Sequence, residues 1–275
     1  MRSIAIIAAK EMRDGLRNRW VIATTALLAA LALTLAFMGA APTGSVKVSA
    51  LNVTIVSLSS LSIFLVPLIA LLLSYDAIVG EAERGTLSLL LAYPVRRWQV
   101  VIGKFAGHLG ILTLATVVGY GAAGLALAFA GGGDPEALAA FALMVASSAM
   151  LGGVFIAIGY LVSALVRDRG AAGGVAIGVW LLFVLLYDMA LLGALVADRG
   201  KTITAGAVNV LILINPADAY RVLNLTASQS VGGYAGVAGL GVRAGLTPGL
   251  LIGTLIVWIV APLAGAVAAF ARRPV

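Results

Sequence analysis

The sequence predicts an all-α membrane protein with six spanning helices, and three observations support this: its composition, its long apolar runs and the placement of its basic residues. Of the 275 residues, 62% are hydrophobic and only 11% are charged. A soluble domain has about 45 to 50% apolar and about 25% charged residues. A helical bundle satisfies its backbone polar groups internally, so it can place this much apolar surface in lipid.

Six apolar runs are long enough to cross a bilayer, which needs about 20 residues each. They lie near residues 20–40, 52–75, 105–130, 137–166, 171–196 and 249–271. The chain is expected to form a single transmembrane domain over residues 1–275. Its parts are an interfacial helix (1–19), spans one and two (20–75), a cytoplasmic loop (76–104), spans three to five (105–197), an outer segment (198–247), and span six with the C-terminus (248–275).

The basic residues predict that both termini are cytoplasmic. With the N-terminus inside, thirteen of the eighteen lysines and arginines lie on the cytoplasmic side, as the positive-inside rule expects. The five on the outer side are Lys47, Arg199, Lys201, Arg221 and Arg243. The net charge of +7 therefore reflects membrane topology, and a nucleic-acid partner is not expected, because the basic residues form no extended stripe.

Several classes of chemistry are excluded by what the chain lacks. It has no cysteine, so it has no disulfide and no thiolate site. It has no phosphate-binding loop, since Gly103 and Lys104 are followed by Phe105, and no H-E-x-x-H motif. We therefore expect a non-enzymatic chain with no cofactor and no metal site of its own. The first apolar run is too long for a signal peptide and is interpreted as an uncleaved span.

Residues 2–19 have apolar side chains at helical spacing, among them Ile4, Ile7 and Met12, and charged side chains on another face. This pattern predicts an amphipathic helix in the cytoplasmic membrane interface. The alternative is a basic flank in front of the first span. Within the spans, the pairs Gly103 with Gly107 and Gly174 with Gly178 have the spacing that allows helices to approach closely.

The cytoplasmic loop between spans two and three is the most informative stretch, and it reads DAIVGEAERGTLSLLLAYPVRRWQVVIGK from Asp76 to Lys104. Acidic residues precede four leucines within residues 87–91, and Tyr93 and Pro94 then predict a corner between two helices. A cytoplasmic loop has little reason to expose four leucines to water. They either return to the membrane surface or dock into a groove of a partner.

This loop, between the second and third of six spans, resembles the permease subunits of the ABC-2 family of ATP-driven transporters. The resemblance covers the whole chain and implies a homodimer in the bacterial inner membrane, with a coupling helix seated on a cytoplasmic ABC ATPase dimer that binds ATP and magnesium. The residues implied at the ATPase contact or at the return into span three are Glu81, Glu83, Arg84, Gly85, Thr86, Leu87, Leu90, Pro94, Arg97, Gly103 and Lys104.

The outer segment contains a helix start at Asn215 and Pro216, with Asp218 in the first turn. We expect a short helix over residues 217–225 that lies flat at the outer surface. It either seals the bundle as a lid or recognises an outer partner. The residues assigned to this lid or partner site are Asn215, Pro216, Asp218, Tyr220 and Arg221.

The motif NPADAYRVLNL at residues 215–225 is similar to ABC-2 permeases that serve copper-site maturation of nitrous oxide reductase in denitrification. That resemblance implies a periplasmic β-helical protein and a copper chaperone as further partners, with copper handled by the wider complex. The chain gives this no local chemical support, because its six methionines form no tight cluster and are typical of flexible packing.

Two isolated polar residues have alternative interpretations. Asp188, among leucine and methionine in span five, either lies near the outer interface beside Tyr187 or faces a wet cavity and gates it. His108, near the cytoplasmic end of span three, fits a packed or interfacial histidine better than a metal ligand.

The rival functions are a generic ABC-2 exporter of lipid, glycan or drug, a stand-alone secondary transporter and a membrane scaffold. A secondary transporter should show more charged residues or broken helices at the middle of the membrane than this chain does.

Overall fold

The computed structural model describes residues 2–38, 50–129, 135–198, 203–227 and 246–273. These residues form helices and connections, with no strand among them. Of the five basic residues expected on the outer side, only Arg221 lies within these ranges. The expectations for Lys47, Arg199, Lys201 and Arg243 therefore fall outside the described residues.

Five helical segments within the described ranges are long and apolar enough to cross a membrane on their own. They are α3 (Ala50–Ser74) continued into α4 (Val79–Glu83), α6 (Arg97–Phe129), α7 (Pro135–Leu165), the segment Arg169–Asp198, and α13 (Pro248–Arg272). A sixth candidate is the pair of α1 (Arg2–Leu16) and α2 (Arg19–Met38), which meet at a bend of 69°. The number of candidate crossings is therefore six, as predicted, when this bent pair is counted once, with α2 corresponding to the first predicted span and α1 to the predicted interfacial helix.

The segment Arg169–Asp198 changes helix type in its middle. It consists of α8 (Arg169–Leu181), a π-helical turn η1 (Leu182–Leu186) and α9 (Tyr187–Asp198). A π-turn widens the helix and shifts the backbone hydrogen bonds, and such turns often occur at functional sites. Only 17% of the apolar window of this segment is buried, so most of its surface is free to face lipid or another chain.

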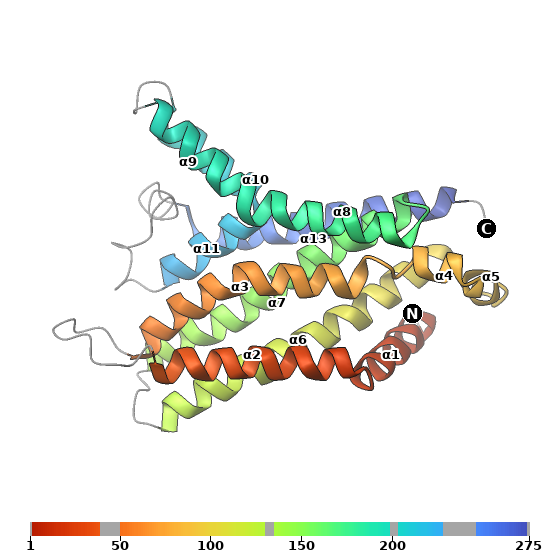
Figure 1. Ribbon diagram of the computed structural model, residues 1–275, viewed down its shortest axis with the longest axis horizontal. Coiled ribbons are helices and arrows are strands. Elements are labelled where there is room, and N and C mark those ends of the chain that lie inside the picture. Colours follow the sequence, from red (N-terminus) through yellow and green to blue (C-terminus); the bar gives the residue numbers. More distant parts are fainter. Residues whose placement is uncertain (1, 39–49, 130–134, 199–202, 228–245, 274–275) are drawn as a thin grey trace.

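The bundle is built around α7, of which 67% of the apolar window is buried. Its neighbours are α3, α6, α11 and α13. Both chain termini lie at the same end of the bundle as α4 and α5 (Thr86–Leu91), whereas α9 and α11 (Pro216–Ala227) extend toward the opposite end (Figure 1). This arrangement agrees with an even number of crossings.

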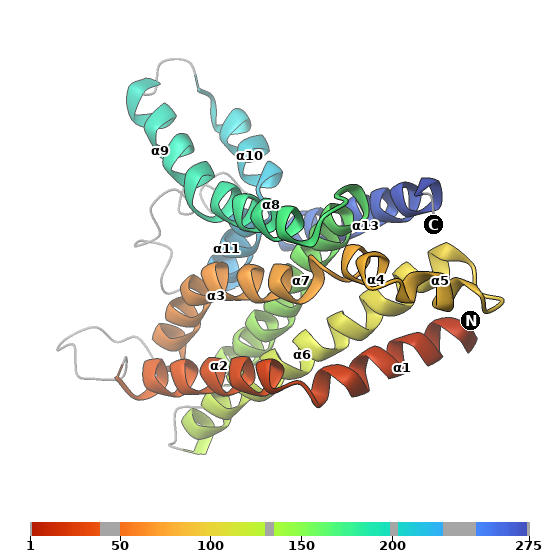
Figure 2. The same cartoon turned by 45° about the vertical axis from the view of Figure 1, so that its right-hand side comes forward.

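The amphipathic helix α1 lies alongside the first half of α6 (Figure 2). Glycines on α6 permit this contact, because a Cβ added to Gly103 would lie 2.8 Å from Cβ of Ile7, and one added to Gly107 would lie 2.6 Å from Cβ of Glu11. The prediction of a close approach at this glycine pair is confirmed. Gly174 and Gly178 meet nothing within 4 Å, so that pair makes no such contact within the described chain.

The expectation of a helix lying flat at the outer surface needs correction. The helix is present as α11 and begins at Pro216 as predicted, but Ala219, Tyr220, Val222 and Leu223 are all completely buried. It packs against α3, α7 and α13 inside the bundle. The preceding α10 (Ala205–Ile214) is too short to cross a membrane and meets α11 at a buried corner.

Candidate functional site

The segment between α3 and α6 contains the predicted corner, which lies between α5 and α6, but the part before the corner is divided into two short helices, α4 and α5, which the sequence analysis did not predict. Gly85 joins α4 to α5 with a φ of 70°, a left-handed backbone conformation that a side chain disfavours. After α5, Tyr93 and Pro94 form the corner, and α6 begins at Arg97. The side-chain oxygen of Gln99 accepts a hydrogen bond from the backbone N–H of Arg96 at 2.9 Å, which caps the start of α6.

A buried ion network ties this segment to the interfacial helix. Nζ of Lys104, on α6, lies 2.9 Å from a carboxylate oxygen of Glu11 on α1 and 2.7 Å from a carboxylate oxygen of Glu81 on α4. The Lys104 side chain is only 6% exposed. One buried cation therefore holds three helices together, and neither carboxylate could stay buried cheaply without it.

The network continues into the core through His108. Its Nε2 lies 3.7 Å from Glu11, and its Nδ1 is hydrogen-bonded to the hydroxyl of Tyr160 on α7 at 2.9 Å. Burial raises the pKa of Glu11, but the ion pair with Lys104 and the charges around it lower it more, so that its pKa lies below the ordinary value of 4.5. Glu11 is therefore ionised at neutral pH. His108 is a packed histidine, the interpretation that the sequence favoured.

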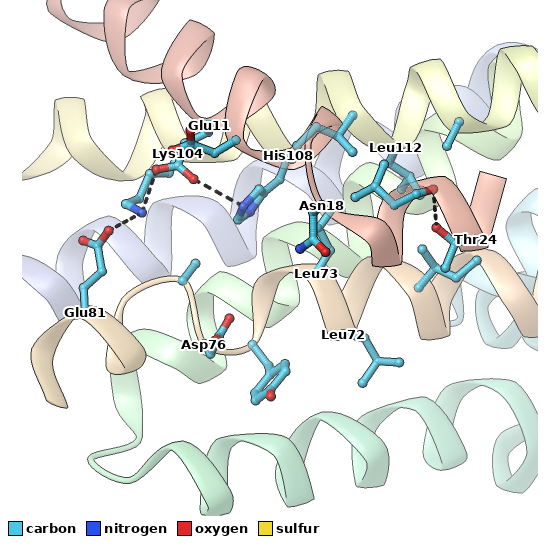
Figure 3. Close-up of a pocket in the computed structure, with 18 of the residues that line it drawn as sticks. Glu11, Asn18, Thr24, Leu72, Leu73, Asp76, Glu81, Lys104, His108 and Leu112 are labelled. Atoms are coloured by element: carbon cyan, nitrogen blue, oxygen red, sulfur yellow. Dashed lines mark hydrogen bonds and ion pairs between the residues drawn. The ribbon is translucent and has the colours of Figure 1, made fainter. Parts of the chain in front are cut away.

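Glu11, Glu81, Lys104 and His108 line a cavity of about 500 Å³ between α1, α2, α3, α4, α6 and the start of α8 (Figure 3). Its charged lining residues are balanced in number, with Lys10, Arg84, Lys104 and Arg169 against Glu11, Asp14, Asp76 and Glu81. Apolar residues such as Leu72, Leu73 and Leu112 line its other part. In Figure 3 the labelled side chains of Glu11, Glu81, Lys104 and His108 point toward one another across it.

A second set of contacts ties the segment to α7 and α8. The hydroxyl of Ser163 accepts hydrogen bonds from the backbone N–H groups of Ile78 and Val79 at 2.9 and 3.1 Å. The guanidinium of Arg169 lies 2.9 Å from Asp76, and its backbone N–H donates to Glu83 at 2.8 Å. The segment is thus held on two sides by side chains from other helices.

The outward face of α5 differs from the expected one. Leu89 is 68% exposed, whereas Leu87 is only 4% exposed and packs in the main hydrophobic core. Leu87 therefore anchors α5 and cannot offer its side chain to a partner in this conformation. The side chains of Leu90 and Leu91 lie outside the described part of the structure. Tyr93 at the corner is 70% exposed and extends the apolar face.

The other residues predicted at the ATPase contact are divided between this network and the surface. Glu81 and Lys104 are in the network and not on the surface. Arg97 donates hydrogen bonds to the carbonyl groups of Phe270, Ala271 and Arg273, so it caps the end of α13. Those that remain exposed are Glu83, Arg84, Gly85, Thr86 and Pro94.

Residue patterns alone missed Glu11 and Tyr160. The signal for Glu11 was present, because residues 4, 7, 8 and 11 share one helical face and the first three are apolar. An acidic residue on that stripe indicates a buried cation opposite. No comparable pattern pointed to Tyr160.

A separate cluster forms where the outer segment meets span five. Arg221 on α11 lies 2.7 Å from Asp188 on α9 and 3.0 Å from Asp218 one turn before it. The sequence analysis treated Asp188 in span five and the helix of the outer segment separately, but their side chains form one cluster. Asp188 is neutralised by an arginine that the sequence assigned only to the outer segment.

The corner between α10 and α11 is satisfied by side chains. The Asn215 amide donates to the carbonyl of Phe183 in the π-turn at 2.9 Å, and its oxygen accepts from the N–H of Ala217 at 3.0 Å. The hydroxyl of Tyr187 donates to the carbonyl of Leu211 at 2.6 Å. Helix-end carbonyls need such partners when buried. Tyr220, hydrogen-bonded to Ser148 at 2.8 Å, is completely buried and does not face an outer partner.

The described residues thus form a multi-span helical bundle, with α1 against α6 and two short helices between α3 and α6. The chain matches the family model of the ABC-2 family transporter protein over residues 5–275 and belongs to that family. Its relatives include the probable ABC transporter permease protein NosY of Stutzerimonas stutzeri, 45% identical over 275 residues that cover 99% of each chain. A second is the probable ABC transporter permease protein NosY of Pseudomonas aeruginosa, 45% identical over 272 residues and 98% of each chain.

These comparisons establish the class of the protein. The chain is a multi-pass membrane permease subunit of an ABC transporter, similar to NosY. It is not an enzyme, because permeases of this class are non-catalytic and a separate subunit hydrolyses ATP.

Proposed function

We propose that this permease couples ATP hydrolysis by a cytoplasmic ATPase dimer to movement of its spans, working as a homodimer in the bacterial inner membrane. The observation that carries the proposal is the buried Lys104, which joins α1, α4 and α6 at 2.9 and 2.7 Å. A push on the segment of α4 and α5 would move the interfacial helix and span three together. A loop without these ion pairs would change its own conformation and would not transmit the movement to α1 and α6.

The surface for the ATPase is the exposed face of α5 and its corner. Leu89 and Tyr93 supply an apolar face, and Glu83, Arg84 and Thr86 supply polar groups beside it. An apolar helix face with a polar rim suits docking into a groove. This end of the bundle also holds both termini, and the positive-inside rule supports a cytoplasmic location for it, because thirteen of the eighteen lysines and arginines are expected on that side.

At the other end, the output is motion delivered to an outer partner in copper-site maturation of nitrous oxide reductase. The resemblance of residues 215–225 and the names of the NosY relatives support this assignment. The partner is a β-helical periplasmic protein, with a copper chaperone and copper in the wider complex. The chain has no cysteine, and its single histidine is hydrogen-bonded to Tyr160, so its own chemistry favours mechanical transmission over passage of copper.

The coupling contact is tested by co-purification with the ATPase encoded beside the permease. Leu89→Asp should abolish the complex, since it places a charge in the apolar contact, while Leu89→Met should retain it as the matched control. Leu87 is unsuitable for this test because it is buried and its change would report on folding. An ATPase that binds Leu89→Asp as well as wild type would locate the contact elsewhere, and one that does not bind wild type would refute the proposal.

A further inference from the structure

A second cavity, of about 590 Å³, lies at the ends of α7 and α13 and is lined by three arginines and four apolar residues. The arginines are Arg167, Arg272 and Arg273. No acidic side chain lines it. The cavity at Lys104 is different, because basic and acidic side chains line it in equal number.

Two of the three arginines have no partner within the described residues. The third, Arg273, donates to the carbonyl of Ser163 at 3.0 Å, near the end of α7. Arg97 already occupies the last carbonyl groups of α13. Helix capping is therefore carried by Arg97 and Arg273, and the guanidinium groups of Arg167 and Arg272 make neither an ion pair nor a hydrogen bond to the described chain.

The apolar part of the lining indicates what kind of anion would fit. Leu165, the last residue of α7, is 65% exposed, and Ala268 and Ala269 stand beside it on α13. Both helices are long and apolar enough to span a membrane and both end here, so we place the cavity where acyl chains give way to headgroups. Basic pockets between spans at this level suit the phosphate of a lipid headgroup.

We propose that this cavity binds the headgroup phosphate of an anionic phospholipid, with Arg167 and Arg272 as its ligands and Leu165 against the acyl chain. Bidentate contacts from guanidinium to phosphate are strong and geometrically specific. A soluble acidic protein surface would use the arginines but would leave Leu165 without a role. The proposal goes beyond the coupling role and does not depend on the ATPase.

The test is native mass spectrometry of the purified full chain in detergent, titrated with phosphatidylglycerol, cardiolipin or phosphatidylethanolamine. We expect wild type to retain the anionic lipids and not phosphatidylethanolamine. Arg167→Gln with Arg272→Gln should weaken binding by about 30-fold, which is about 2 kcal/mol for two arginines at about 1 kcal/mol each. The matched control is Arg13→Gln on α1 with Arg17→Gln just after its end, which removes the same charge and should keep the lipid.

Three results would overturn the proposal. Equal loss in the control pair would indicate general attraction to basic protein. Displacement of the lipid by inorganic phosphate would assign the cavity to a soluble anion. If the Arg167 and Arg272 variant bound lipid as well as wild type but no longer bound the ATPase, these arginines would be assigned to a contact with that protein. Circular dichroism of the variants separates all of these from misfolding.

Discussion

Lys104 stabilises this fold because its charge is buried between two carboxylates that depend on it. Its side chain is 6% exposed, and those of Glu11 and Glu81 are 13% and 17% exposed. A buried ion pair adds little over an apolar packing alternative, but removing one partner leaves the other charge without compensation. Replacing Lys104 should therefore cost more stability than the two ion pairs themselves contribute, because it leaves two buried carboxylates without a counter-ion.

Lys104→Met should destabilise the protein by about 3 kcal/mol, because two buried carboxylates lose their cation. Adding Glu11→Gln and Glu81→Gln should recover much of this loss, since neutral amides need no counter-ion. Thermal unfolding in detergent measures both. If the triple variant is no more stable than Lys104→Met alone, the lysine acts through packing of its methylene chain and not through its charge.

The lowered pKa of Glu11 makes the contribution of this network depend on pH. A carboxylate whose pKa is lower in the native state stabilises the fold above its unfolded pKa, near 4.5, and this contribution is lost as the pH falls through the native pKa. Stability should therefore fall on acidification below 4.5 in wild type and less so in Glu11→Gln. Unfolding curves across that range decide this, and parallel pH profiles would contradict it.

Arg221 has the corresponding role in the outer cluster, between Asp188 and Asp218. Arg221→Gln should be more destabilising than Asp188→Asn, because it removes the cation from two acids, of which Asp218 keeps only the amide of Asn215, whereas Asp188→Asn leaves the second ion pair intact. A double-mutant cycle should give a coupling of about 1 to 3 kcal/mol between Arg221 and Asp188. Additive effects in chemical unfolding would mean that the pair forms without contributing to stability.

At the scale of elements, the close contact of α1 with α6 depends on two glycines of α6, which have no side chain. Glycine at 103 and 107 lets the two helices approach until Glu11 reaches Lys104, so helix packing and the ion network depend on each other. This is the geometry by which small residues bring helices together.

Gly107→Leu should separate α1 from α6, because even a Cβ at this position would lie 2.6 Å from Cβ of Glu11 and 3.0 Å from the backbone oxygen of Ala8. Hydrogen exchange should then show faster exchange of the α1 amides. Gly121→Leu on the same helix is the matched control, since nothing lies within 4 Å of its added Cβ. Unchanged protection of α1 in Gly107→Leu would show that the helices adapt to the larger side chain.

Much of the element level could be predicted from the sequence, and the contacts between elements could not. Apolar runs located the spans, and Pro94 and Pro216 located two helix boundaries, because these signals are local. The pairing of Asp188 with Arg221 depends on where a buried corner places α11, and no spacing along the chain encodes it. Likewise the burial of Leu87 and the exposure of Leu89 depend on how α5 rotates against the bundle.

For the whole molecule, the network at Lys104 and the cluster at Arg221 lie toward opposite ends of a bundle whose centre is α7. Both connect to α7, through Tyr160 at one end and through Tyr220 and Ser148 at the other. α7 is the most buried span and is therefore the element best placed to act as a rigid axis, while the less buried segment Arg169–Asp198 can move against it.

The orientation of this axis in the membrane is testable with unusual clarity, because the chain contains no cysteine. Ser88→Cys on α5 and Ala205→Cys at the start of α10 are both exposed sites in otherwise thiol-free protein. In intact spheroplasts, a membrane-impermeant maleimide should label Ala205→Cys and leave Ser88→Cys unlabelled until the membrane is opened, since the positive-inside rule places α5 in the cytoplasm. Labelling of Ser88→Cys in intact spheroplasts would invert the topology, and α5 could then no longer meet a cytoplasmic ATPase.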